Sequence, residues 1–155
     1  MNFVAQLYVT VFFIGKSRYF PGTLGTLPAI LAYLYLLNYE LEIRVYVTLA
    51  LIFFAYICIS FLYKRNIFVK EDAQEIVIDE FIGYLSFMIF FELNIYYIAI
   101  GFVLFRLFDI YKPYPISLID RKMKNSFGII LDDIVAGIFS ALIIYNINIL
   151  YVSVL

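Results

Sequence analysis

The sequence contains no histidine and a single cysteine, Cys58. The lack of histidine excludes His-dependent general base catalysis, phosphohistidine intermediates and zinc sites with imidazole ligands. One cysteine cannot form an intrachain disulfide or a thiolate metal site, and Cys58 lies in an apolar run where a thiol is normally a small buried hydrophobe. Polar chemistry in this chain must therefore use carboxylates, amines and guanidinium groups.

Charged residues are also scarce. They make up 15% of the chain, against about 25% in soluble domains, whereas apolar residues make up 65%, against about 45–50%. Eleven Lys and Arg against twelve Asp and Glu give a net charge of −1, so no basic field is available to bind a nucleic acid. The length of 155 residues fits one domain, residues 1–155. Length and composition predict a single membrane domain with no nucleic-acid partner.

The apolar runs predict an all-α, multihelical integral membrane bundle. The uncharged segments 45–63 and 134–155 are each long enough to approach a hydrocarbon core of about 30 Å. Three shorter apolar segments are expected to be membrane-associated as well: residues 27–37, 76–91 and 94–109. The first fourteen residues are too short to span and are expected to lie along the interface. We therefore expect about five membrane-associated helices plus an N-terminal interfacial segment.

The positive charges predict an orientation. Ten of the eleven Lys and Arg residues lie in segments that this topology places on one side, and Arg44 is the exception. Lys and Arg in short loops stay in the cytoplasm. Segments 27–37 and 45–63 would then form one hairpin and segments 76–91 and 94–109 another, with all long polar loops facing the cytoplasm.

Two acidic doublets stand at predicted helix starts. They are Asp79–Glu80 and Asp132–Asp133. Gly83 follows Asp79 by four residues, and Gly137 follows Asp133 by four residues. At this spacing the carboxylate and the glycine share a helix face, where another helix or a ligand can come close. Carboxylates near a bilayer are costly and repel one another unless a cation lies between them. Ligand sets made of oxygen alone favour magnesium or manganese over zinc.

Asp72 and Glu75 extend the first doublet, because positions 72, 75 and 79 share one face of a helix. The same two residues fit a helix-capping box, and the sequence favours neither interpretation. The candidate metal ligands are Asp72, Asp79, Glu80, Asp132 and Asp133.

Cations that could bind a phosphate lie at the end of the fourth predicted helix, 94–109, and in the loop that follows it. Arg106 and Asp109 share a helix face, the proline that follows Lys112 forces that lysine out of helical geometry, and Arg121 lies in the same loop. Arginine forks and lysine point charges are the usual phosphate partners. The alternative is anchoring of the protein at the membrane surface. Anchoring is the favoured interpretation for Lys122 and Lys124.

The segment PGTLGT precedes the predicted helix 27–37. Thr26 is expected to cap that helix, and the backbone amides near Thr23 and Thr26 could hold an anion. A plain helix-entry turn explains the same residues equally well.

Five blocks occur in a fixed order between residues 21 and 137: PGTLGT, IVIDEFIG, GFVLFRLFDIYKPYPI, DR and FGIILDDIVAG. Together they resemble the phosphatidylglycerophosphatase A family. The resemblance implies a magnesium-dependent phosphatase of a bacterial-type inner membrane that converts phosphatidylglycerophosphate, a phospholipid, to phosphatidylglycerol, and it leaves the oligomeric state open. The matching motif positions are Asp79, Glu80, Arg106, Asp109, Lys112, Pro113, Asp120, Arg121, Asp132 and Asp133. Where many relatives have Asp followed by His or Pro, this chain has Asp72-Ala73-Gln74, so no imidazole can assist there.

The chemistry and the resemblance suggest the same roles. Asp79, Asp109 and Asp133 are the candidate catalytic residues, and Arg106, Lys112 and Arg121 would neutralise the phosphate. Asp109 could orient Arg106 or act as base or nucleophile. Two alternatives are a phosphatase of another lipid or isoprenoid phosphate and an ion-coupled membrane transporter, which would need acids at mid-membrane depth and usually repeated halves.

Overall fold

The computed structural model describes residues 2–67 and 74–154, and within these ranges the chain forms helices and no strand. In chain order they are α1 (Asn2–Val9), the short 3₁₀ helix η1 (Ile14–Lys16), α2 (Pro21–Leu36), α3 (Leu41–Lys64), α4 (Ile78–Met88), α5 (Ile95–Tyr111), α6 (Ile116–Lys122) and α7 (Ser126–Val154). The prediction of an all-α fold is confirmed.

Two helices are long and apolar enough to cross a membrane, Leu41–Lys64 and Ser126–Leu150. They correspond to the two long uncharged runs of the sequence. Their outer faces are apolar as well, since the side chains of Phe53 and Leu142 are 66% and 54% exposed. Extended exposed apolar surface is unfavourable in water and suits contact with lipid. The chain thus has the features of a helical membrane protein.

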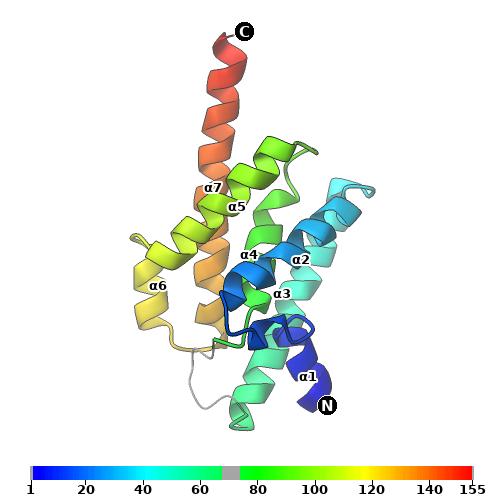
Figure 1. Cartoon of the computed structure of the whole chain (residues 1–155), viewed down its shortest axis with the longest axis vertical. Coiled ribbons are helices and arrows are strands. Elements are labelled where there is room, and N and C mark those ends of the chain that lie inside the picture. The colour runs from blue at the N-terminus through cyan, green and yellow to red at the C-terminus, as the bar shows by residue number, and fades with distance from the viewer. Residues whose placement is uncertain (1, 68–73, 155) are drawn as a thin grey trace.

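Helix α4 is shorter than the predicted segment 76–91. Its 11 residues extend about 16 Å, too little to cross a bilayer. It is buried on most sides, with Ile82, Tyr84 and Leu85 fully enclosed, and it packs most extensively against α7 and α2 rather than against α5 (Figure 1). The hairpin predicted for segments 76–91 and 94–109 is therefore not the main packing unit, because α4 is the centre of the bundle.

Several helices begin earlier than the apolar runs suggested. Helix α2 begins at Pro21, since proline fits the first helical position, where its missing N–H costs no hydrogen bond. Helix α7 begins at Ser126, where the side chain of Asn125 accepts hydrogen bonds from the backbone N–H groups of residues 127 and 128. Asp132 and Asp133 therefore lie in its second turn. Glu75 precedes α4 and is not helical, so the prediction of one helix face holding positions 72, 75 and 79 is wrong.

Helices α4 and α7 cross closely at two glycines. A Cβ atom added to Gly83 would lie 2.8 Å from Cβ and 2.9 Å from the carbonyl oxygen of Asp133, and one added to Gly137 would lie 2.7 Å from the carbonyl oxygen of Gly83. Side chains at these positions would hold the helices apart. The expectation that these glycines admit another helix is confirmed, and the crossing brings the two acidic doublets together.

Arg44 connects helices at the opposite end of the bundle. It is the one Lys or Arg residue that the predicted topology does not place on the cytoplasmic side. Its guanidinium donates to the carbonyl oxygens of Leu37, Tyr39 and Ile89 at 2.8–3.3 Å. These acceptors lie just after α2 and α4, where helix carbonyls lack intrahelical partners. Helix α1 packs against α3, with the hydroxyl of Tyr8 donating to the Leu51 carbonyl. Its expected place at the membrane interface stays a prediction.

Candidate active site

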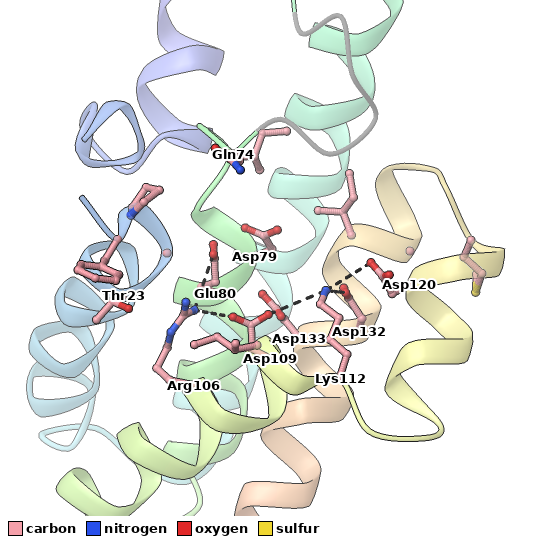
Figure 2. Close-up of a pocket in the computed structure, with 18 of the residues that line it drawn as sticks. Thr23, Gln74, Asp79, Glu80, Arg106, Asp109, Lys112, Asp120, Asp132 and Asp133 are labelled. Atoms are coloured by element: carbon pink, nitrogen blue, oxygen red, sulfur yellow. Dashed lines mark hydrogen bonds and ion pairs between the residues drawn. The ribbon is translucent and has the colours of Figure 1, made fainter. Parts of the chain in front are cut away.

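A cavity of about 520 Å³ lies where α2, α4 and α7 begin and α5 ends (Figure 2). Five helices and the segment before α4 contribute its walls. Its polar lining residues are Thr23, Gln74, Asp79, Glu80, Arg106, Asp109, Lys112, Asp120, Lys124, Asp132 and Asp133. Acidic and basic groups that are far apart in the sequence thus face one cavity.

Three carboxylates form the acidic centre of the cavity. Asp79 and Glu80 come from the first turn of α4 and Asp133 from α7, and one oxygen of each lies within 4.8 Å of the others. Asp79 Oδ1 and Glu80 Oε2 are buried and have no hydrogen-bond partner in the described structure. Buried carboxylate oxygens without donors suit a hard divalent cation, which accepts oxygen ligands. The three residues therefore fit a magnesium site.

The protonation of this centre reflects its burial. Burial, followed by repulsion from the neighbouring carboxylate of Glu80, raises the pKa of Asp79 well above its usual range. Burial likewise raises the pKa of Glu80 to about 7, although its hydrogen bond with Asp79 and the charge of Arg106 act in the opposite direction. Without an added positive charge, the ionised carboxylates are unfavourable here.

Asp132 faces the other side of the cavity. Its Oδ2 accepts a short hydrogen bond from Lys112 Nζ, which also lies 3.4 Å from Asp120 Oδ1. Lys112 follows α5 in a left-handed conformation with φ 43°, so the prediction that it leaves helical geometry is confirmed. Burial by itself would lower the pKa of Lys112, but the carboxylate of Asp132 more than offsets this and raises it. Lys112 is therefore a fixed positive charge.

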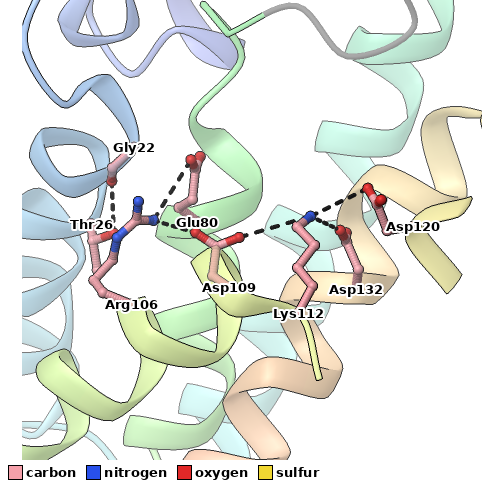
Figure 3. Close-up of polar contacts among 8 residues, drawn as sticks. All are labelled: Gly22, Thr26, Glu80, Arg106, Asp109, Lys112, Asp120 and Asp132. Atoms are coloured by element: carbon pink, nitrogen blue, oxygen red, sulfur yellow. Dashed lines mark hydrogen bonds and ion pairs between the residues drawn. The ribbon is translucent and has the colours of Figure 1, made fainter. Parts of the chain in front are cut away.

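Arg106 links the acidic centre to Lys112 (Figure 3). Its Nη1 donates to Asp109 Oδ2 at 2.6 Å and lies 3.8 Å from Glu80 Oε1, and Asp109 Oδ1 is 4.0 Å from Lys112 Nζ. A Cβ added to Gly22 would collide with Glu80 Oε1 and lie 2.9 Å from Arg106 Nη2. A side chain at residue 22 would therefore displace the ends of the Glu80 and Arg106 side chains.

Two predicted site residues lie outside the cavity, and the structure does not describe a third. Thr26 is fully buried inside α2 and donates to the Gly22 carbonyl at 2.8 Å, so the prediction that it caps the helix is wrong, because the helix begins at Pro21. Arg121 is exposed on α6 and does not line the cavity. Asp72 lies outside the described residues.

Two polar residues of the cavity wall were not predicted. Gln74 lines the cavity from the segment before α4. Lys124 also lines it, and its Nζ lies 3.6 Å from Asp120 Oδ1. The spacing of four between Asp120 and Lys124 was the available signal, because it suggests an ion pair as readily as a membrane anchor.

The chain thus combines two helices long and apolar enough to cross a membrane with one cavity in which carboxylates and fixed cations converge. These are the groups that an enzyme acting on phosphate esters needs. The family model for phosphatidylglycerophosphatase A matches residues 7–148. The chain belongs to the phosphatidylglycerophosphatase A family, and it is a phosphatase.

Curated relatives agree with this family. The chain is 38% identical to phosphatidylglycerophosphatase A of Escherichia coli K12 over 138 residues, which cover 86% of this chain and 77% of the relative. It is 32% identical to phosphatidylglycerophosphatase A of Haemophilus influenzae over 83% of this chain and 78% of the relative. It is also 32% identical to a Bacteroides thetaiotaomicron protein named "Putative phosphatidylinositol-3-phosphatase", over 92% of both chains. No solved structure matches the chain.

Proposed function

We propose that this protein is a magnesium-dependent lipid phosphatase that hydrolyses phosphatidylglycerophosphate to phosphatidylglycerol and phosphate. The observation that carries the proposal is the single cavity in which Asp79, Glu80 and Asp133 converge beside Arg106 and Lys112. The substrate assignment is supported by two relatives named phosphatidylglycerophosphatase A.

Asp79, Glu80 and Asp133 would hold the magnesium ion. When bound, the ion supplies positive charge beside the phosphate and makes a water molecule more acidic. Its charge would also offset the burial, and the repulsion between neighbouring carboxylates, that raise the pKa values of Asp79 and Glu80. Asp132 is already paired with Lys112, so we assign it to that lysine rather than to the metal.

Arg106 and Lys112 would bind the phosphate oxygens. In the reaction, water adds to phosphorus, the bond from phosphorus to the glycerol oxygen breaks, and that oxygen takes up a proton. Negative charge shifts toward the departing oxygen during this step, and fixed cations stabilise it. Asp109 contacts both cations and is assigned as a positioning residue that orients them.

The membrane explains how such a substrate arrives. We place the cavity at the cytoplasmic face of a bacterial-type inner membrane, because it lies at the end of the bundle that carries ten of the eleven Lys and Arg residues in the predicted topology. The lipid would reach it by lateral diffusion with its acyl chains among the helices. The acids gather at this end rather than along the bundle, which disfavours an ion path.

The decisive experiment measures phosphate release from phosphatidylglycerophosphate by purified protein in detergent micelles, with magnesium and with a chelator. Asp79→Asn and Asp133→Asn should each reduce turnover by about 10²-fold or more, because each removes a charged ligand. Glu42→Gln, the same kind of change on exposed α3 surface, is the control and should keep wild-type activity. Full turnover by both aspartate variants, or turnover unaffected by the chelator, would refute the assignment of the metal site.

The Bacteroides relative's name supports a second substrate class, a phosphoinositide. The same assay with phosphatidylinositol-3-phosphate separates the two. A higher kcat/KM for the inositol lipid would replace the substrate proposed here while keeping the same site and chemistry.

A further inference from the structure

An apolar groove of about 780 Å³ lies beside the active-site cavity. It is lined by Phe13, Ile14, Lys16, Ser17, Leu24, Leu27, Pro28, Ile30 and Leu31. Its polar groups come from Lys16 and Ser17 of the segment around η1, and the rest of the wall is hydrocarbon. Ligand pockets of such size, mostly apolar with a few placed polar groups, suit molecules with a large apolar part.

The groove and the active-site cavity share helix α2. Residues 20–23 line the cavity, and Leu24, Leu27 and Leu31 line the groove one to two turns further along the same helix. The side chains at 24, 27 and 31 lie on one face, which extends about 10 Å from the cavity toward the other end of the bundle. The groove therefore begins at Leu24, the residue that follows Thr23 of the cavity wall.

Lys16 gives the groove a positive end. Its ammonium lies 5.0 Å from the centre of the Phe13 ring, and both residues are part of the groove wall. Lys16 is exposed, and no acidic partner is recorded for it among the described residues. A wall of hydrocarbon with a cation at its polar end matches an anionic phospholipid, whose phosphodiester joins the acyl-bearing glycerol.

We infer that this groove binds one acyl chain of the phospholipid substrate, with Lys16 next to the phosphodiester, while the terminal phosphate occupies the active-site cavity. This inference rests on the proposed function. Leu27 is 45% exposed and Leu31 is 70% exposed, so an acyl chain would cover apolar surface that the protein leaves open. The groove would favour long-chain lipids over soluble phosphate esters.

The test fills the groove. Leu27→Trp places a bulky side chain in it, and Leu34→Trp, on the same helix but outside the groove lining, is the matched control. The sequence has no tryptophan, so fluorescence also reports whether each variant is folded. Leu27→Trp should lower kcat/KM about tenfold or more for phosphatidylglycerophosphate with sixteen-carbon chains and change it less than about twofold for a four-carbon form. Equal effects on both substrates, or none on either, would overturn the inference.

A binding measurement separates this inference from the proposed function. Native mass spectrometry of the protein with dipalmitoyl phosphatidylglycerol requires no turnover. Wild type and Leu34→Trp should retain one more lipid than Leu27→Trp, and Lys16→Gln should weaken that retention while Arg18→Gln, a neighbour outside the groove, should not. Identical lipid retention in all variants would refute the groove. Failure of the wild type to release phosphate from either form of phosphatidylglycerophosphate, with sixteen-carbon or four-carbon chains, would refute the proposed function instead.

Discussion

Replacing Gly83 by alanine should damage the active site without touching any of its charged groups. The added Cβ would lie 2.8 Å from the Asp133 Cβ and 2.9 Å from both the Asp133 carbonyl oxygen and Phe105 Cε2. Ordinary carbon contacts are about 3.5–4.0 Å, so α4 and α7 must separate by up to about 1 Å. One of the contacts is backbone, which cannot rotate away. The displacement falls between the helix that carries Asp79 and the helix that carries Asp133.

The expected effect on activity is larger than the effect on stability. Overpacking costs about 1–3 kcal/mol, and alanine regains about 1 kcal/mol over glycine inside a helix, so the free energy of unfolding should fall by at most about 2 kcal/mol. A shift of about 1 Å in an active site can cost about 10² in rate. Gly83→Ala should therefore fold, yet lose about 10²-fold in kcat and bind magnesium more weakly.

Phosphate release and magnesium titration of purified Gly83→Ala would check this prediction. Gly101→Ala is the matched control, because its added Cβ would meet Met88 Sδ at 3.1 Å and both Ile144 Cδ1 and Phe87 Cε2 at 3.3 Å. These are side-chain atoms that need to move by only a few tenths of an ångström, and none of the contacts is backbone. The control should keep activity within about twofold of wild type. If both variants have wild-type turnover and magnesium affinity, the close crossing does not position the carboxylates, and the reasoning is wrong.

Three further predictions follow from the charges of the site. Glu80→Gln should raise the free energy of unfolding of the chelator-treated protein by about 1–3 kcal/mol at pH 8, and this range is reduced because the Glu80 side chain is 15% exposed. In unfolding experiments in detergent, the gain should become smaller as the pH is lowered toward 5. The sign follows because the folded-state pKa of about 7 lies above the ordinary 4.5, so ionisation in this window favours the unfolded chain. Arg106→Lys should lower kcat about 10- to 100-fold with an unchanged melting temperature, because lysine cannot replace the guanidinium group that contacts Asp109 and Glu80. A wild-type kcat for this variant would contradict the phosphate-binding role of Arg106. Magnesium should raise the melting temperature of wild type by several degrees and that of Asp133→Asn by much less, and equal shifts would count against ligation by Asp133.

The sequence predicted the helical class and the chemical composition of the site, because both depend on residue types. The long apolar runs identified α3 and α7, and the doublets with a glycine one turn later identified the acids at the crossing. It did not predict which acids would face the candidate metal site and which would pair with a cation. The neighbours Asp132 and Asp133 differ in this respect, because Asp132 pairs with Lys112 and Asp133 lies with Asp79 and Glu80. That difference comes from helix rotation, in which adjacent residues lie about 100° apart.

The predicted starts of helices α2 and α7 were wrong because the sequence was divided by its apolar runs. Apolar runs mark where helices are buried in hydrocarbon, whereas helices begin at capping residues and prolines, which here lie in the polar segments before the runs. Helix α2 therefore starts at Pro21 and α7 at Ser126, each ahead of the apolar run. Thr26 was assigned to a cap on the assumption that the run and the helix coincide.

Helix α4 is too short to span a bilayer, and this is consistent with the chemistry proposed here. An acidic doublet at the start of a spanning helix would place its charges at the bilayer surface, where water screens them. Because α4 has only 11 residues and is enclosed by α2 and α7, its first turn lies within protein, and Asp79 has a buried oxygen with no donor. In such an environment a bound cation gains more from each carboxylate than at an open surface. The burial that makes this bundle less stable without a metal is therefore the same feature that would give the site its affinity for one.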